Sequence, residues 1–449
     1  MCDGTNASID DSARLRGLKQ ILSQSLIDRE IGDQLRTRHC KRIKNPQLIW
    51  LIVGMGLFAG KSYRQIFRLC STPETIVPIR ATLTTARKRL SASLLEQLYG
   101  GVVNLLGKSP TKHPFAFYKG LRLMGVDGTL LDCPDTDANR EEFGRTSNQT
   151  SHGAFPKARV VSLCELGTRV LWRSIIGTYH QSEQKLTLPL LGNLSQSMLL
   201  LADRHFGIAP IIYPLIKRKV PFLIRVKKSQ LFPVEKVLCD GSFLSTIYLG
   251  KNDRRSKRPG KTVRVIRYTH RDPNRTGCGE IHVLVTSLLD AEKYLAVELI
   301  ELYHVRWEEE IAFSEWKVTL CNGTMLRSQS PEMVRQEIWG MLLSHFILRT
   351  LIFRSAEEAG VEPIRISFTG ALDILHARLP ETKKSRPLKK KWLDDLITEI
   401  SQEQLPPRVD RINPRKLKKR SKAWQTKRDG DRSPPKPSGP FTDQIQISI

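Results

Sequence analysis

The chain has 449 residues and a mass of 51.1 kDa, with 72 Lys and Arg against 45 Asp and Glu, so its formal net charge is +27. This length predicts about two to four domains, and a hydrophobic content of 40% excludes global disorder. The positive charge attracts polyanions, so nucleic acid is the first partner to expect and an anionic membrane surface the second. Ribosome-associated proteins and ordinary basic enzymes share this balance, so charge alone does not decide.

Three further classes of protein are disfavoured by local sequence. The longest apolar run, residues 48–59, is well short of the roughly 20 residues that span a bilayer. Residues 1–15 lack the basic and apolar regions of a secretory signal. The cysteines lie far apart without a C-x-x-C pair, which argues against a zinc ribbon or a disulfide framework. We therefore expect a cytoplasmic protein with reduced thiols and no membrane segment.

The first region, residues 1–115, is expected to be a helical N-terminal DNA-binding domain. An apolar run over residues 48–58 ends before Gly60, and Ser62 with Gln65 then has the spacing of a capping box. Two helices around a glycine turn are either a helix-turn-helix reader of DNA or an ordinary helical hairpin with a solvated basic face. The basic residues around this pair are Arg36, Arg38, Lys41, Arg42, Lys44, Arg64 and Arg68.

Residues 116–218 alternate between strands and helices, which predicts an α/β region with a mixed sheet. One expected strand ends at Asp127, and a later apolar run stops at Asp203. Each acid has a structural alternative: Asp127 forms a turn with Gly128, or Asp203 caps the helix that follows. The expected strands cover 121–127, 159–165, 169–176 and 198–202, and the expected helices cover 186–194 and 208–218.

Residues 219–290 interrupt this alternation with β-like runs between basic, turn-rich segments, which predicts a β-rich insertion. The β-like runs are 222–226, 242–249, 263–270 and 281–287. A second, helical part of the core is expected over 291–382, with a long helix over 291–318 and further helices over 331–356. Residues 383–449 are basic and in part Pro-rich, which predicts a partly disordered C-terminal tail.

The long helix carries a stripe of phenol, guanidinium, carboxylate and ammonium groups. At about 100° per residue, four of its side chains fall within one narrow sector. They belong to Tyr303, Arg306, Glu310 and Lys317. Such a set suits a phosphate beside a metal ion, because guanidinium and ammonium groups bind phosphate oxygens while a carboxylate binds the cation. An exposed helix with ordinary ion pairs fits the same spacing equally well.

This stretch resembles the signature of DDE transposases of the "insertion sequence 4" family, in which Tyr, Arg, Glu and Lys are separated by two, three and six residues. Residues 126–129 (V-D-G-T) are similar to the family's first-aspartate strand, and residues 201–207 (L-A-D-R-H-F-G) to its second-aspartate motif. The order of the two aspartates, the β-insertion and the glutamate helix is also the family's order. The resemblance covers roughly residues 30–350.

The resemblance implies a fold and a reaction. The fold is an RNase H-like α/β catalytic core interrupted by a β-rich insertion and preceded by a helical N-terminal domain. Asp127 would end the first strand of the core, Asp203 would end the fourth, and Glu310 would come from a helix. These three acids would be catalytic and would bind two Mg²⁺ ions, for which Mn²⁺ can substitute, during DNA cleavage and strand transfer.

The resemblance also implies how DNA is held. Tyr303, Arg306 and Lys317 would bind the phosphate of the transposon end, with Arg204 and His205 as further candidates. The expected partners are double-stranded DNA, as terminal inverted repeats and as target, and a second copy of the chain in a dimer assembled on DNA. Two other functions remain open: a transposase-derived regulator that binds DNA without cutting, and a structure-selective nuclease.

One position departs from the family's pattern. Some relatives stack a tryptophan of the β-insertion on a flipped base, but this chain has no tryptophan between Trp172 and Trp307. An aromatic substitute is compatible with base stacking. The candidates are Phe222, Phe232, Phe243, Tyr248 and Tyr268, for which a place in the sheet core is the alternative.

Overall fold

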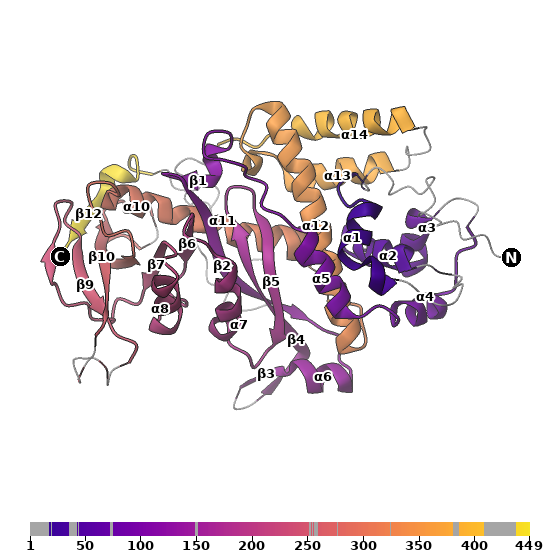
Figure 1. Cartoon of the computed structure of the whole chain (residues 1–449), viewed down its shortest axis with the longest axis horizontal. Coiled ribbons are helices and arrows are strands. Elements are labelled where there is room, and N and C mark those ends of the chain that lie inside the picture. The colour runs from indigo at the N-terminus through magenta and orange to yellow at the C-terminus, as the bar shows by residue number, and fades with distance from the viewer. Residues whose placement is uncertain are drawn as a thin grey trace, which may run out of the picture. The chain divides into compact units, whose positions relative to one another are not determined.

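The computed structural model describes residues 18, 20–35, 43, 45–71, 75–148, 151–250, 253, 255, 259–275, 277–323, 325–379, 386–407 and 437–449. They divide between two compact units, the first within residues 1–193 and 308–405 and the second within residues 194–307 and 406–449. Among these residues, no helix is long and apolar enough to cross a membrane. The mixed α/β class expected from the sequence is confirmed (Figure 1).

The first unit begins with helices, in agreement with the helical pattern of this region. They are α1 (Gln24–Leu35), α2 (Asn45–Leu57), α3 (Tyr63–Cys70), α4 (Arg80–Arg87) and α5 (Ala92–Val102). The predicted capping box at the start of α3 is confirmed, because the Ser62 hydroxyl and the Gln65 side chain each accept a hydrogen bond from the other's backbone amide. The expected basic residues Arg36, Arg38, Lys41, Arg42 and Lys44 lie outside the described residues.

Helix α12 (Pro331–Ala359) is the centre of the helical part of this unit (Figure 1). It packs against α2 and α5, and also against α13 (Phe368–Arg378) and α14 (Arg386–Ser401). The contact with α2 is close, because a Cβ at Gly340 would overlap Ile52, and the Ser344 hydroxyl donates to Val53 O at 2.6 Å. Helix α2 is buried along nearly its whole length and is therefore not available to enter a DNA groove.

The sheet of the first unit is built around one long strand. It comprises β1 (Phe117–Tyr118), β2 (Leu121–Asp132), β3 (Arg145–Asn148), β4 (Ser151–Glu165) and β5 (Val170–Thr178). Strand β4 pairs antiparallel with β2 along one edge and with β5 along the other. Four short helices precede, separate or follow these strands in the chain: η2 (Pro114–Ala116), α6 (Asp137–Phe143), α7 (Glu183–Leu190) and η3 (Leu191–Asn193). Because both edges of β4 are paired, its central residues are buried and fix the position of β2.

In the residues that the structure describes, the second unit consists mainly of a sheet and the helices α8 (Ala209–Lys217) and α10 (Ala296–Tyr303). Its strands are β6 (Met198–Ala202), β7 (Phe222–Val226), β8 (Lys236–Val237), β9 (Phe243–Ile247), β10 (Lys261–His270), β11 (His282–Thr286) and β12 (Ile445–Ser448). Strands β6 and β7 are parallel, and the order continues antiparallel through β11, β10, β9 and β8. The β-like runs expected within 219–290 therefore form one continuous set of paired strands.

Two segments differ from the expectations. The helix expected over 291–318 is a succession of α10, a 3₁₀ turn η4 (His304–Arg306), α11 (Trp307–Ser314) and a π-helix η5 (Glu315–Leu320). The stretch expected as a disordered tail contains α14, the 3₁₀ turn η9 (Thr442–Gln444) and strand β12, which pairs antiparallel with β10. The sequence signal for β12 is weak because its hydrogen-bond partner lies far away in the chain. The tail residues 408–436 lie outside the described residues.

Candidate active site

The first candidate acid, Asp127, lies in the middle of a strand. Strand β2 continues to Asp132, with Asp127 opposite Ser162 of β4, so the expectation that Asp127 ends its strand is wrong. The ladder to β4 runs without interruption through Gly128, which also removes the alternative of an Asp-Gly turn. The Asp127 carboxylate accepts a hydrogen bond from the Gly128 amide at 2.7 Å. A half-buried carboxylate on a paired, rigid strand is suited to holding a fixed position.

The second candidate acid, Asp203, follows directly after β6, as the sequence predicts. Its Oδ1 accepts from the His205 amide at 2.7 Å, which closes a tight turn after the strand. Helix α8 has Ile208 as its N-cap, so Asp203 does not cap this helix. The neighbouring Arg204 and His205 are exposed, and the His205 ring packs against Phe206 in an edge-to-face arrangement.

In the second unit, Tyr303 of the stripe lies close to Asp203, and Arg306 lies close to Tyr303. The Tyr303 hydroxyl donates to the carbonyl oxygen of Ala202 at 3.2 Å, one residue before Asp203. Burial raises the pKa of Tyr303 well above its usual value, against the opposing charge of Arg306. The Arg306 guanidinium carbon lies 5.9 Å from the Tyr303 ring centroid and 5.3 Å from that of Trp307, so the guanidinium is held near both aromatic faces.

The third candidate acid is one of three consecutive glutamates in α11, and their environments differ. Glu308 is bound by Arg169, whose Nε donates to its Oε2 at 2.6 Å. Glu309 is fully buried, whereas Glu310 is only half-buried. Glu308 and Glu310 are thus both partly exposed, and Glu309 is the acid enclosed inside the unit.

Glu309 is also close to the strand that carries Asp127. A Cβ at Gly125 would overlap Oε2 of Glu309, so the carboxylate occupies the space above this glycine. Side chains alternate along a strand, so positions 125 and 127 belong to the same face of β2. No local pattern singles out Glu309, because the packing of its carboxylate over Gly125 joins residues far apart in the chain. Its negative charge, after burial itself, is a cause of the raised pKa of Cys164.

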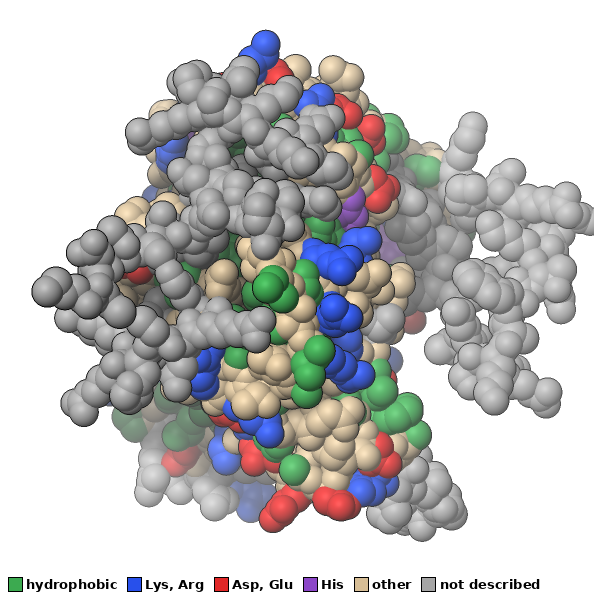
Figure 2. Space-filling view, turned by 90° about the vertical axis from the view of Figure 1, so that its right-hand side faces the viewer, with side chains coloured by type: hydrophobic (Ala, Val, Ile, Leu, Met, Phe, Trp, Pro, Cys, Tyr) green, Lys and Arg blue, Asp and Glu red, His purple; other side chains and the backbone are tan. Residues whose placement is uncertain are grey.

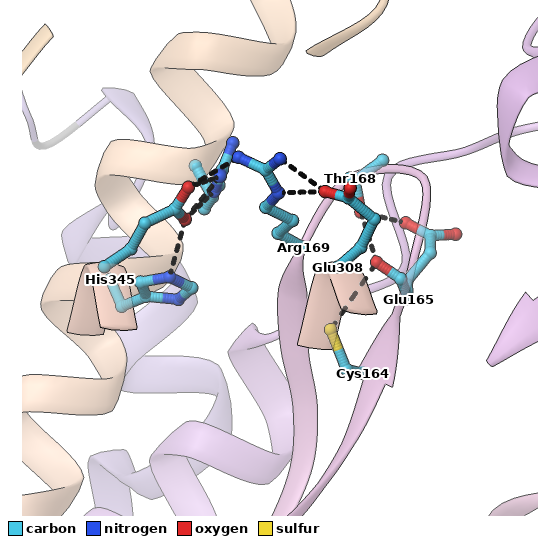
Figure 3. A network of polar contacts seen from close by, with 8 residues as sticks. Cys164, Glu165, Thr168, Arg169, Glu308 and His345 are labelled. Carbon is cyan, nitrogen blue, oxygen red and sulfur yellow. Dashed lines mark hydrogen bonds and ion pairs between the residues drawn. The ribbon is translucent and has the colours of Figure 1, made fainter. Parts of the chain in front are cut away.

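The opposite side of α11 and η5 is held by a buried network of ion pairs (Figure 3). Arg169 binds Glu308 (Figure 3). Arg169 also binds Glu315, donating to Glu315 Oε1 through Nη1 at 2.7 Å. Glu315 is bound again by Arg349 of α12, whose Nε donates at 2.9 Å. Burial would raise the pKa of Glu315, but Arg349 and Arg169 hold it well below its usual value. His345 Nε2 lies 3.7 Å from the same carboxylate.

The backbone of Arg169 is unusual. Its φ is 57°, in the left-handed region that non-glycine residues seldom adopt. It sits at the turn between β4 and β5, immediately before Val170, and its side chain is almost fully buried. An L-residue in this conformation costs roughly 1–2 kcal/mol, so the contacts of the guanidinium stabilise a strained turn.

The stripe expected from an ideal helix needs correction. Residues three apart nearly eclipse in a 3₁₀ turn, so Tyr303 and Arg306 are closer in angle than an α-helix would place them. The π-helix η5 has a wider turn, so the angular position of Lys317 also departs from the even step of about 100°. Lys317 Nζ donates to the carbonyl oxygen of Leu130 on β2 at 2.6 Å. The lysine is thus anchored three residues beyond Asp127.

The candidate residues are shared between the units. Asp127, Glu310 and Lys317 belong to the first unit, and Asp203, Arg204, Tyr303 and Arg306 belong to the second. Over the described part of the chain, no group of three or more His, Cys, Asp or Glu side chains is arranged to hold a metal ion.

Other acids near Asp127 in sequence are engaged in ion pairs. Asp132 is paired with Lys157, and Asp135 with Arg145. Asp137 is paired with Arg140 of the same helix turn. Carboxylates neutralised by neighbouring cations are poor competitors for the role expected of Asp127. Of the candidate stacking aromatics, Phe222, Phe232, Phe243 and Tyr268 are buried, which favours a place in the sheet core, and Tyr248 is half-buried.

One polar pair near this site had no sequence signal. Arg225 of β7 donates to His282 Nδ1 of β11 at 2.8 Å. Because arginine only donates, this ring nitrogen must be the unprotonated one, so the histidine is neutral. Burial, followed by the charge of Arg225, lowers the pKa of His282 to about 4. Arg225 also acts on the phenol of Tyr303, so a second guanidinium lies near the residues that flank Asp203.

Comparison with known proteins identifies the family. Residues 119–347 match the model of the transposase DDE domain, and residues 12–100 match that of the insertion element 4 transposase N-terminal region. The transposase InsG for insertion sequence element IS4 of Escherichia coli (strain K12) is 27% identical over 93% of this chain and 95% of its own length. The putative transposase InsZ of the same strain is 29% identical over 37% of this chain and 55% of its own length.

Among solved structures, a piggyBac transposase synaptic complex with hairpin DNA covers 90% of this chain and 88% of its own, at 12% identity and a TM-score of 0.43. This likeness is too low to carry an argument. The DDE domain match spans more than half of the chain, from before β2 into α12. The chain therefore belongs to the insertion sequence 4 family of DDE transposases, enzymes that cleave DNA and transfer its strands during transposition.

Proposed function

We propose that Asp127, Asp203 and Glu310 are the catalytic carboxylates of this transposase and together bind divalent metal ions. DDE transposase domains use divalent metals, and the donor set here consists only of carboxylate oxygens. Such hard donors fit Mg²⁺, with Mn²⁺ as a substitute, and do not suit softer metals. When bound, the metal would activate the attacking oxygen and stabilise the leaving one in an in-line displacement at phosphorus.

The residues of the chain would supply position and charge to this reaction. Asp127 is fixed by the ladder between β2 and β4, and Asp203 by the turn in which it accepts from the His205 amide. Glu310 is carried by a helix whose other acids are held inside the unit. Rigid placement of each carboxylate reduces the rearrangement that metal and phosphate binding would otherwise require.

Four cationic or phenolic side chains are proposed to hold the scissile phosphate and its neighbours. They are Tyr303, Arg306, Lys317 and Arg204. The guanidinium of Arg306 offers a bidentate fork to phosphate oxygens, and Lys317 offers a point charge. Lys317 is already directed toward β2 through its bond to Leu130 O, and Arg204 is exposed next to Asp203. These observations support roles in DNA binding near the acids.

The fine architecture and the partners are part of the same proposal. We infer an RNase H-like core interrupted by a β-rich insertion over residues 219–290, which corresponds to the strands from β7 to β11. The substrate is the pair of terminal inverted repeats that bound the chain's own element, followed by a target duplex. Both ends must be cut and joined together, which favours a homodimer assembled on DNA.

The observation that carries the assignment of the acids is the spacing of the Tyr, Arg, Glu and Lys signature in a chain whose residues 119–347 match the transposase DDE domain. This spacing selects Glu310 and not its two neighbours. Of these neighbours, Glu308 is bound by Arg169, and the Glu309 carboxylate lies over Gly125.

The test is cleavage of a duplex carrying the DNA that bounds this gene, with Mg²⁺, Mn²⁺ or EDTA. Wild type is compared with Glu310→Gln and with Glu301→Gln, a matched change at an exposed glutamate of α10. We expect metal-dependent nicking at the 3′ end in wild type and Glu301→Gln and none in Glu310→Gln, with DNA binding retained throughout. Undiminished cutting by Glu310→Gln would remove this residue from the site. Specific binding without cutting by any form would instead favour a regulator.

A further inference from the structure

Helix α4 has one buried face that fixes it to the rest of the first unit. Leu83, Ala86 and Arg87 are buried, and they recur at the spacing of one helix face. The Arg87 guanidinium donates to the Tyr63 hydroxyl of α3 at 2.8 Å and to Met333 O of α12 at 3.2 Å. Helix α4 is thus held by a buried arginine against two other helices.

The opposite face of α4 is exposed and carries small and basic side chains. At about 100° per residue, Ala81, Thr85 and Lys88 lie roughly opposite the buried face, and Thr82 lies beside them. All four are exposed. Arg80 is exposed at the start of the helix as well. The helix therefore presents two hydroxyls, a methyl group and two cations to its surroundings.

Helix α3 adds positive charge next to this face. Arg64 and Arg68 are exposed, while Tyr63, Ile66 and Phe67 are buried. Neither α3 nor α4 contains an Asp or Glu in its sequence. Figure 2 views the molecule from the side on which α3 and α4 are drawn in Figure 1: Lys and Arg side chains gather near the middle of this view, and most Asp and Glu side chains lie toward its upper and lower margins.

We propose that α4 is the helix that reads the sequence of the transposon ends in the major groove, with α3 as its supporting helix. This inference rests on the proposed function, in which the chain binds its terminal repeats. It moves base reading from α3, the second helix of the hairpin around Gly60, to α4, whose exposed face carries hydroxyl and methyl groups in addition to cations. The occupant is duplex DNA, since its phosphates complement a face without acids.

The exposed side chains of α4 match the two kinds of contact that specific DNA binding needs. Threonine hydroxyls bond to base edges, and alanine or threonine methyl groups contact the thymine methyl in the major groove. Thr82 and Thr85 are therefore assigned to base reading. Lys88 and the arginines of α3 are assigned to phosphates, which fix the register of the helix without reading sequence. Thr84 has a different task, because its hydroxyl donates to Arg80 O within the helix.

The test measures binding of the full chain to two duplexes in EDTA, so that no cleavage occurs. One duplex carries the terminal repeat that bounds the gene, and the other carries the same bases in scrambled order. The variants are Thr82→Ala with Thr85→Ala, and Lys88→Ala. The matched control is Lys185→Ala, which removes an exposed lysine from α7 in the same unit. Circular dichroism confirms that each variant folds, as expected for exposed side chains.

The two classes of variant should behave differently. The double threonine variant should lose roughly tenfold or more of the preference for the terminal repeat, with unchanged affinity for the scrambled duplex. Lys88→Ala should weaken binding to both duplexes and lower the slope of log affinity against log salt by about 0.9. Lys185→Ala should match wild type in both measurements.

Three outcomes would overturn the inference. If the double threonine variant keeps the wild-type preference, α4 does not read the bases. If Lys185→Ala changes the salt slope as much as Lys88→Ala, DNA is attracted by the positive charge of the whole surface, and α4 is not a specific DNA-binding site. If wild type itself shows no preference for the terminal repeat, the proposed binding of the ends fails, and the inference fails with it.

Discussion

The arginine that holds the glutamate helix offers a sharp test of how this active site is positioned. Arg169 is almost fully buried and binds Glu308 and Glu315, which flank the candidate catalytic Glu310 on the same helical segment. Replacing it by alanine leaves Glu308 enclosed without its cation, whereas Glu315 keeps its bond to Arg349. The change therefore removes one anchor of the helix and spares the other.

The expected cost follows from burial. Removing one partner of a buried ion pair costs about 3–5 kcal/mol, because the remaining charge stays desolvated. For a unit of this size, that corresponds to a fall in Tm of roughly 5–15 °C. Arg169→Gly should be less harmful, since glycine adopts a φ of 57° freely and relieves roughly 1–2 kcal/mol of strain. The order of stability is therefore wild type, then Arg169→Gly, then Arg169→Ala.

The assay is a thermal scan of the full chain, followed by cleavage of end DNA well below every transition. The control is Arg140→Ala, because Arg140 is 39% exposed and its pairs with Asp135 and Asp137 contribute at most about 1 kcal/mol. Helix misplacement by about 1 Å can cost roughly a hundredfold in rate. We expect Arg169→Ala to cleave DNA about 10- to 100-fold more slowly than wild type and to keep its affinity for DNA.

Two results would refute this reasoning. If Arg169→Ala melts within a degree or two of Arg140→Ala, the buried pair does not stabilise the unit. If Arg169→Ala is more stable than Arg169→Gly, the left-handed backbone at this position does not store strain. Arg169→Lys gives a further check, because lysine keeps the charge but loses the two-sided fork that reaches both glutamates.

Three other changes test single features of the site. Gly125→Ala should displace the Glu309 carboxylate and slow cleavage, whereas Gly100→Ala, where a Cβ meets open space, should leave activity unchanged; both are measured by end cleavage and Tm. Tyr303→Phe removes one hydrogen bond, so stability measured by urea unfolding should fall by only about 1 kcal/mol while binding of cut ends weakens. The pKa of His282 is lowered to about 4 by burial and by its arginine neighbour, so its contribution to stability is present above the unfolded pKa near 6.5 and is lost as pH falls toward 4. A Tm that does not decline between these values, or declines equally in His282→Asn, would contradict that linkage.

Much of this fold could be predicted because its signals are local. The capping box before α3 needs only Ser62 and Gln65 at the right spacing, and it is confirmed. The apolar run that ends before Asp203 is a buried strand, as expected, because a short apolar run bounded by turn residues is typical of a fully buried strand. The spacing of Tyr303, Arg306, Glu310 and Lys317 in the chain is also a local signal, because it does not depend on how the surrounding residues fold.

The features that could not be predicted depend on partners far away in the chain. Asp127 lies in mid-strand because β4 continues to pair with β2 beyond Gly128, and the Asp-Gly pair by itself favours a turn. Strand β12 forms by pairing with β10, about 175 residues earlier in sequence. The departures from α-helical winding in η4 and η5 have no composition signal, yet they change the angle at which Arg306 and Lys317 project.

The three glutamates of α11 show why spacing and packing are both needed to choose a catalytic acid. An α-helix turns about 100° per residue, so consecutive acids must face three different environments. Of the three, Glu308 is bound by Arg169, and the Glu309 carboxylate lies over Gly125. Glu310 is half-buried, as is Glu308, so exposure alone does not distinguish these two acids, whereas the family spacing does. A substitution that moved Arg169 or filled the space above Gly125 would therefore shift the helix that carries Glu310 and leave the Glu310 side chain itself unchanged. Slower cleavage by such a variant would report the position of the carboxylate, whereas slower cleavage by Glu310→Gln would report its chemistry.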